Sequence, residues 1–140
     1  MCELEDEVVF NCRVGARIAS VCASREWSAE NGRFQYRFGR PQRLEIAVPF
    51  PSARPRESAR AGVLSFSGGG GAYLRFPAGR HAYVVYTAIS GRWGERAGVV
   101  VERDGRPLAA FDCRGPIESM IGPALFERGG FEEDAGGFLI

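Results

Sequence analysis

The sequence predicts an all-β protein: an antiparallel β-barrel or sandwich of about eight or nine strands with a short helical C-terminal segment. Alternation of apolar and polar residues with a period of two dominates the chain. Glycine-containing pairs that favour tight turns separate the alternating runs. Four cysteines in 140 residues are typical of a disulfide framework in a small all-β protein.

Nine segments carry the alternation and are predicted to be strands. They are residues 7–12, 17–23, 33–38, 43–48, 63–67, 72–76, 81–88, 97–103 and 106–111. Phe34, Tyr36 and Phe38 alternate with polar residues, so we expect them to share one face. The run from Tyr83 to Tyr86 is apolar at every position, which predicts a strand buried on both faces.

Three turns are also predicted from the sequence. Asp104-Gly105 lies between two apolar runs and favours a two-residue type I′ hairpin, because both central residues of that turn need positive φ. Val14-Gly15 and Ala78-Gly79 indicate two further hairpins. Residues 49–62 contain three prolines and predict a surface loop or a strand-to-strand crossover.

The last part of the chain departs from the strand pattern. Apolar residues at roughly helical spacing, interrupted by Gly122-Pro123, predict one or two short helical turns. These apolar residues are Ile117, Met120, Ile121, Leu125 and Phe126. The acidic, glycine-rich residues 132–137 predict a loose terminal tail. We expect a disulfide-stapled β domain over residues 1–113 and an extension over 114–140 that packs on the same domain.

The register of the first hairpin suggests how the cysteines pair. A turn at Val14-Gly15 does not place Cys12 opposite Cys22, whereas Cys22 lies opposite the start of the first strand, close to Cys2. This predicts Cys2–Cys22 and leaves Cys12 to pair with Cys113. The second bond would close a loop of about 100 residues, worth ~4–5 kcal/mol in the chain-entropy model.

Disulfides imply an oxidising compartment, so we expect a periplasmic or secreted protein. No signal peptide precedes Cys2, and we interpret Met1 as a start residue added after removal of an export signal. An alternative is that Cys2 carries a lipid in place of a disulfide. No apolar run approaches the ~20 residues of a membrane-spanning helix.

The net charge of +1 conceals a basic middle, because residues 8–62 hold ten arginines and four glutamates. This surface could attract an anionic partner or could simply be solvated. All eighteen basic residues are arginine. Nucleic-acid binding needs a concentrated basic stripe and a known module, and the sequence displays neither, so no nucleic-acid partner is expected.

Catalytic signatures are weak. His81 is the only histidine, and a Ser-His-Asp site would need it beside Ser65 or Ser67 and an acid such as Asp112. One histidine and oxidised cysteines give too few ligands for a metal, so neither metal nor cofactor is expected. A non-catalytic protein is therefore predicted. The alternatives are a small periplasmic hydrolase using His81 or an acid pair, and a structural or assembly protein of the cell envelope.

Two glycine-containing segments are the candidate binding loops. Residues 67–73 contain four consecutive glycines, which let a partner's backbone approach closely but also suit a β-bulge or wide hairpin turn. A strand follows them, so a phosphate-binding loop, which leads into a helix, is excluded. In residues 91–97, Trp93 beside Arg92 would be a strong interface anchor or a cap on the end of a barrel. Trp27 is predicted to be a lid of the core.

Residues 65–113, together with Cys12, resemble the bacterial periplasmic and membrane-bound lysozyme inhibitors of the MliC/PliC type. The resemblance consists of residues 69–73, the stretch 93–99 and a hairpin that ends in Cys113. It implies an exported β-barrel whose two loops enter a lysozyme cleft and meet its catalytic carboxylates. Gly69 stands where the family has its loop serine, and Trp93, beside Arg92, where it has its lysine.

The sequence thus predicts an exported binding protein with a protein partner, for which a lysozyme is the candidate. The expected contact residues are Ser67, Gly69, Tyr73, Arg92 and Trp93.

Overall fold

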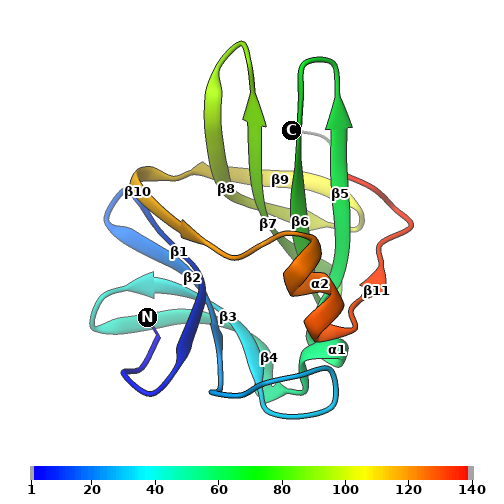
Figure 1. Cartoon of the computed structure of the whole chain (residues 1–140). Helices are drawn as coiled ribbons and strands as arrows, with labels where there is room; N and C mark the ends of the chain where they lie inside the picture. Colours follow the sequence, from blue (N-terminus) through cyan, green and yellow to red (C-terminus); the bar gives the residue numbers. More distant parts are fainter. Residues whose placement is uncertain (1, 139–140) are drawn as a thin grey trace.

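The computed structural model describes residues 2–138, which form two β-sheets packed against each other (Figure 1). The first sheet has the order β10-β1-β2-β3-β4 and the second β11-β5-β6-β7-β8-β9. The first contains β1 (Glu7–Val14), β2 (Arg17–Ala23), β3 (Phe34–Arg40), β4 (Arg43–Ala53) and β10 (Arg114–Ser119). The second contains β5 (Arg60–Phe66), β6 (Gly69–Ala78), β7 (His81–Ser90), β8 (Gly94–Arg103), β9 (Arg106–Asp112) and β11 (Glu132–Glu133). The helices are α1 (Pro55–Ser58) and α2 (Pro123–Gly129).

The predicted fold class is confirmed. Neighbouring strands are antiparallel except β11 and β5, which run parallel. Within residues 2–138 the two sheets do not close into a barrel, so the molecule is a sandwich. All nine predicted strands are present, and β2 has the predicted bounds. The Asp104-Gly105 turn is also confirmed, with φ values of 52° and 78°.

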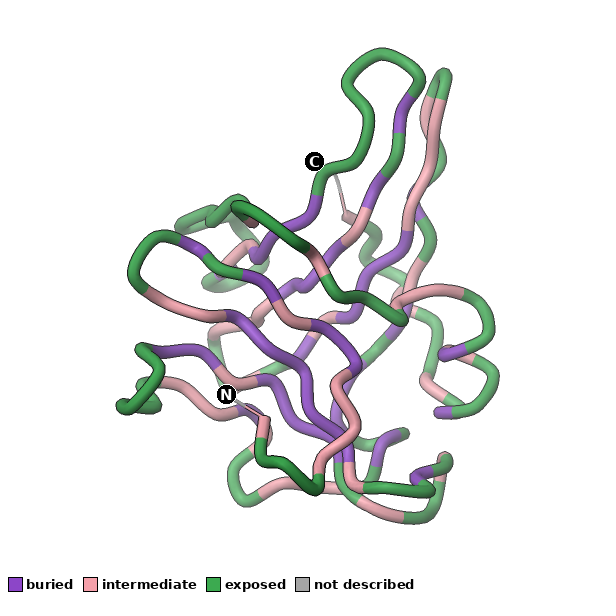
Figure 2. Tube along the Cα trace, turned by 60° about the vertical axis from the view of Figure 1, so that its left-hand side comes forward, coloured by how far each residue is buried: buried purple, intermediate pink, exposed green. Residues whose placement is uncertain are grey.

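Aromatic residues fill the core between the sheets. Phe34, Tyr36 and Phe38 are all buried, which confirms that these alternating positions of β3 share a face. Trp27 is buried beside Phe34, with ring centroids 5.2 Å apart, and acts as the predicted lid of the core. Figure 2 shows buried residues concentrated along the middle of the strands and exposed residues at many of the turns.

Strand β7 of the second sheet is buried on both faces. Val85 of β7 points into the main core, whereas Val84 and Tyr86 belong to a smaller apolar cluster on the outer face. The predicted burial of this strand on both faces is therefore confirmed. The outer cluster also contains Leu64 and is partly covered by Phe138 from the end of the chain.

Both predicted disulfides are present. Cys2 bonds to Cys22, and Cys12 bonds to Cys113, so the Cys2 sulfur is not free to carry a lipid. Two disulfides indicate an oxidising, extracytoplasmic environment.

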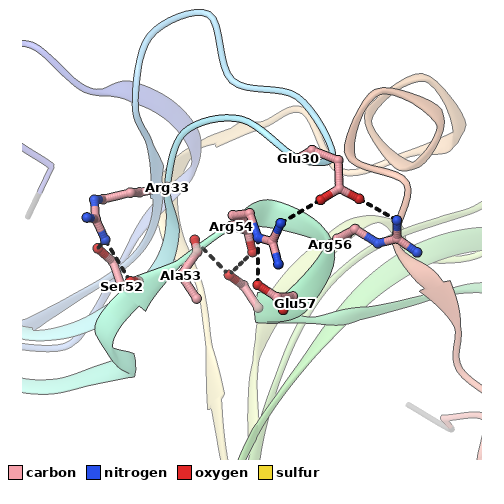
Figure 3. A network of polar contacts seen from close by, with 8 residues as sticks. Glu30, Arg33, Ser52, Ala53, Arg54, Arg56 and Glu57 are labelled. Carbon is pink, nitrogen blue, oxygen red and sulfur yellow. Dashed lines mark hydrogen bonds and ion pairs between the residues drawn. The ribbon is translucent and has the colours of Figure 1, made fainter.

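The proline-rich segment is the crossover from the first sheet to the second. β4 continues to Ala53, one turn of α1 follows, and β5 begins at Arg60. Figure 3 shows how Glu30, in the loop before β3, pairs with both Arg54 and Arg56. Arg54 also pairs with Glu57 at 2.8 Å. These exposed pairs each contribute little free energy, but together they hold the crossover against the β2–β3 loop.

The C-terminal region differs from the prediction in two respects. Ile117 lies in strand β10, which pairs with β1, and the helix begins only at Pro123. Residues 132–137 are not a loose tail, because β11 adds to β5 and Asp134 contacts the second sheet. Both differences arise from long-range strand pairing, which local spacing does not reveal.

Candidate functional site at the hairpin tips

The β5–β6 and β7–β8 hairpins project beyond the rest of the sandwich (Figure 1). The first turns at Ser67 and Gly68, and the second turns at residues 91–93. Because β6 and β7 are neighbours, the two turns adjoin, and the Gly91 N–H donates a hydrogen bond to the Gly68 carbonyl at 3.0 Å. The structure thus brings together two segments that are more than twenty residues apart in the chain. We refer to Phe66, Ser67, Arg92, Trp93 and Arg96 as the tip surface.

Trp93 is the centre of the tip surface. Its ring stacks on Phe66, with centroids 5.8 Å apart and planes inclined by 25°. The Arg96 guanidinium lies over the indole at 4.4 Å, a cation–π distance. The residue remains 37% exposed. A large aromatic side chain that is already oriented in the free protein loses little conformational entropy when a partner covers it.

The β7–β8 turn is fixed by its own sequence. Gly94 follows the three-residue loop with φ of 77°, a conformation that favours glycine and completes this type of hairpin. The Arg92 N–H donates to the Ser90 hydroxyl at 3.0 Å. The loop backbone is therefore held in place, while the side chains of Arg92 and Trp93 face solvent at the tip.

Gly69 supports the tip rather than presenting a side chain there. Of the four consecutive glycines, Gly68 lies in the turn and the other three belong to strand β6, where Gly69 is paired with both Phe66 and Ser90. A Cβ atom at Gly69 would lie 2.2 Å from the Ile89 carbonyl oxygen and 2.7 Å from the Phe66 ring. The residue is therefore needed for close contact between the hairpins.

Tyr73 lies away from the tip surface. It is only 1% exposed, and its hydroxyl donates to Asp134 at 2.7 Å. Burial, reinforced by this hydrogen bond and by the charge of Asp134, raises the pKa of Tyr73 to about 12. A partner cannot reach this side chain while the C-terminal segment covers it.

Sequence reasoning missed Phe66 and Arg96, which complete the tip surface around Trp93. A signal existed for Phe66, since it ends the apolar alternation of a predicted strand immediately before the turn. Val63 and Ile89, 70% and 64% exposed, lie on the opposite face of the same hairpins. The projecting hairpins therefore expose apolar side chains on both faces.

Within residues 2–138, Ser65 and Asp112 do not lie beside His81 as a Ser-His-Asp site would require. Ser65 is paired with Gly70 of β6, and Gly70 is paired with Ile89 of β7. Ile89 is eight residues from His81 along β7, which is roughly 25 Å at the usual rise of a strand. Asp112 is aligned through β8 with Tyr86, which is five residues from His81 along β7.

A single group of three potential metal ligands occurs among residues 2–138: Cys2, Asp6 and Cys22. Its two sulfurs form a disulfide, so they are not the thiolates that a metal would need.

Comparison with models of known protein families, with curated protein sequences and with solved structures finds no match. The structure itself defines the class: an all-β sandwich with two disulfides. None of the helices within the described part of the chain is long and apolar enough to span a membrane.

Proposed function

We propose that this chain is an exported, non-catalytic binding protein of the periplasm or the extracellular space. It contacts a protein partner through the tip surface at the ends of the β5–β6 and β7–β8 hairpins.

One observation carries this proposal. The hydrogen-bonded turns hold Trp93 at the projecting ends of the two hairpins, where its ring stacks on Phe66 and the Arg96 guanidinium lies over it. Tryptophan and arginine dominate the residues that supply binding energy at protein interfaces. Val63 and Ile89 expose further apolar surface on the opposite face of the same hairpins.

The charges at the tip favour a partner with carboxylates. Arg92 and Arg96 are both exposed, and Glu95 is the one acidic side chain in the same turn region. An arginine guanidinium pairs with a carboxylate through two parallel hydrogen bonds. Ser67 and Arg92 flank the hydrogen bond that joins the turns, so a hydroxyl and a cation are presented together.

A lysozyme is the specific partner that the family resemblance suggests. In the lysozyme inhibitors that the sequence resembles, a serine and a lysine enter the enzyme's cleft and meet its catalytic carboxylates. Gly69 and Trp93 occupy the positions of that serine and lysine here, whereas Ser67 and Arg92 offer a hydroxyl and a guanidinium from the two joined turns. The direct test measures inhibition and binding of c-type and i-type lysozymes by the oxidised protein. Nanomolar to micromolar inhibition supports this partner, and absence of binding to both enzymes excludes it.

Replacing Trp93 by alanine tests the tip surface. Once a binding partner is in hand, Trp93→Ala should weaken binding by about 2 kcal/mol or more, because the central aromatic anchor is lost. Titration calorimetry or surface plasmon resonance gives this difference.

Leu44→Ala is the matched control, since Leu44 is an exposed apolar residue on β4, outside the tip surface. It should leave the affinity unchanged. Equal affinities of the Trp93→Ala variant and the native protein would show that binding occurs elsewhere.

A further inference from the structure

The last described residues run from the edge of the second sheet across its outer face, with a turn at Ala135 and Gly136, and we call them the C-terminal strap (residues 131–138). Its first part adds to the edge of the sheet: Glu132 is paired with Arg60, and Glu133 with Ala61, as a parallel strand. The Asp134 N–H then donates to the Ala61 carbonyl at 2.8 Å. This is the geometry of β-strand addition, by which many domains bind extended peptides.

Asp134 is the polar attachment of the strap. Its side chain is only 4% exposed, and it forms an ion pair with Arg75 and accepts the Tyr73 hydroxyl hydrogen bond. Arg75 is held in turn by Glu102 at 2.9 Å and donates to the Gly137 carbonyl at 3.0 Å. A buried carboxylate is stable only with such partners, so the sheet presents a site built for one acidic side chain.

Phe138 is the apolar attachment. Its ring lies 5.4 Å from Tyr73 and 5.5 Å from Tyr86, measured between centroids, with tilted planes in both contacts. Two tyrosines on neighbouring strands thus form a cradle for one aromatic ring. Phe66 of the tip surface packs against the same outer cluster.

Between these attachments the strap is poorly packed. A groove of about 880 Å³ runs along it, lined by Arg75, Glu102 and the strap itself. A second hollow, of about 280 Å³, is lined by Tyr73 and by strap residues that include Phe131. The three residues between Asp134 and Phe138 are exposed, and the carbonyl of Gly137 accepts a hydrogen bond from Arg75. A segment held mainly by the side chains at its two ends, with few contacts between them, resembles a bound ligand more than a layer of the core.

We propose that the outer face of the second sheet is a peptide-binding groove, occupied here by the chain's own strap. It takes a peptide that adds a short strand to the sheet edge and then turns, with an acidic residue followed four positions later by an aromatic residue. Arg75 and Tyr73 bind the acid, and Tyr73 and Tyr86 hold the ring. The groove borders the tip surface at Phe66, but the proposal does not depend on the function proposed above.

An attached strap competes with any free peptide. A tethered segment acts at an effective concentration in the millimolar range, so it excludes weak ligands from the intact protein. The apparent affinity for a free peptide is reduced by the fraction of molecules in which the groove is open. Removing contacts of the strap should therefore raise the apparent affinity of the groove for a free peptide without changing the groove itself.

The experiment uses the full chain with both attachments removed, Asp134→Ala combined with Phe138→Ala. The probe is a fluorescently labelled peptide with the sequence of residues 131–138, and binding is followed by anisotropy. The double variant should bind this peptide at least about tenfold more tightly than the native protein, because its own strap no longer competes. A peptide with alanine at the two attachment positions should not bind.

The matched control is Glu132→Ala combined with Glu133→Ala, which changes two exposed acidic residues of the same strap and keeps both attachments. It should behave as the native protein does. The proposal is overturned if the double variant, with native circular dichroism and both disulfides, does not bind the peptide, or if it binds the alanine peptide equally well.

Hydrogen exchange of the native protein provides a test that needs no variant. The Asp134 amide should exchange much faster than the amides in the centre of β6, by local opening of the strap. Exchange of both only through global unfolding would show that the strap is part of the core and would refute the proposal. Concentration-dependent dimerisation of the double variant mixed with native protein would identify a second copy's strap as a source of the peptide.

Discussion

At the scale of single residues, glycines allow the aromatic rings of the second sheet to lie flat on their neighbours. Tyr73 is paired with Gly62, and a Cβ atom at Gly62 would lie 2.3 Å from the tyrosine ring. Tyr86 is paired with Gly98, where a Cβ atom would come within 3.2 Å of the phenol oxygen. An aromatic ring over a cross-strand glycine covers backbone that would otherwise be exposed, which offsets the low strand propensity of glycine.

Gly71 is a residue of the glycine run at which substitution should be harmful. A Cβ atom there would lie 2.1 Å from the Thr87 carbonyl oxygen, a backbone atom of the central strand β7 that cannot move aside cheaply. We predict that Gly71→Ala destabilises the fold by about 1–3 kcal/mol, the usual penalty of overpacking. Gly91→Ala is the control, since its nearest atom would be 3.9 Å away. Urea denaturation measures both, and equal midpoints would contradict the close packing of β6 and β7.

Tyr73 should make the stability of the protein depend on alkaline pH. Its pKa is about 12 in the folded protein, and a phenol in an unfolded chain has its ordinary pKa of about 10. The unfolded chain therefore loses this proton first. The stabilisation linked to the Tyr73 proton is fully present below pH ~10. It is lost as the pH rises through about 12, the pKa of Tyr73 in the folded protein.

The corresponding measurement compares the free energy of unfolding of the native protein and of Tyr73→Phe across this pH range. As the pH rises, the free energy of unfolding of Tyr73→Phe should fall less than that of the native protein. The variant lacks the phenol whose ionisation favours the unfolded chain. Parallel curves would mean that Tyr73 ionises equally readily in both states.

At the scale of secondary-structure elements, local sequence signals predicted the hairpins but not the C-terminal region. Alternation and turn residues depend on neighbours in the chain, and they located the nine strands and the turn at Asp104-Gly105. The same hairpins bring the turns that contain Ser67, Arg92 and Trp93 together, a juxtaposition that the alternation pattern alone did not predict. The burial of Tyr73 could not be foreseen, because it depends on Asp134, sixty-one residues further along.

The helix α2 shows which local signals were decisive at the C-terminus. The spacing of apolar residues from Ile117 onward suggested helical turns. Residues 114–119 instead form strand β10, because they pair with β1. Pro123 does not interrupt a helix but begins one, in the position where its missing N–H costs nothing. Gly130 then ends it as the C-cap. Proline at the start and glycine at the end were better guides to this element than hydrophobic spacing.

At the scale of the whole molecule, the Cys12–Cys113 disulfide joins the two sheets where the chain passes between them. Cys12 belongs to β1 of the first sheet, and Cys113 follows β9 of the second. The next residues form β10, which returns to pair with β1. The bond therefore fixes the end of the second sheet beside the strand on which β10 must form. Cys2–Cys22, by contrast, attaches the N-terminal residues to β2 of the same sheet.

This difference predicts unequal contributions of the two disulfides to stability. The bonded residues are 101 positions apart in Cys12–Cys113 and 20 in Cys2–Cys22. In the chain-entropy model, these loops correspond to about 5 and about 3 kcal/mol respectively. Cys12→Ala with Cys113→Ala should therefore lower the free energy of unfolding more than Cys2→Ala with Cys22→Ala, since each pair contains one buried cysteine and the loop lengths make the difference. Urea denaturation of the two double variants gives the comparison. If removal of Cys2–Cys22 proved the more damaging, the N-terminal residues would contribute more to the native state than the connection between the sheets.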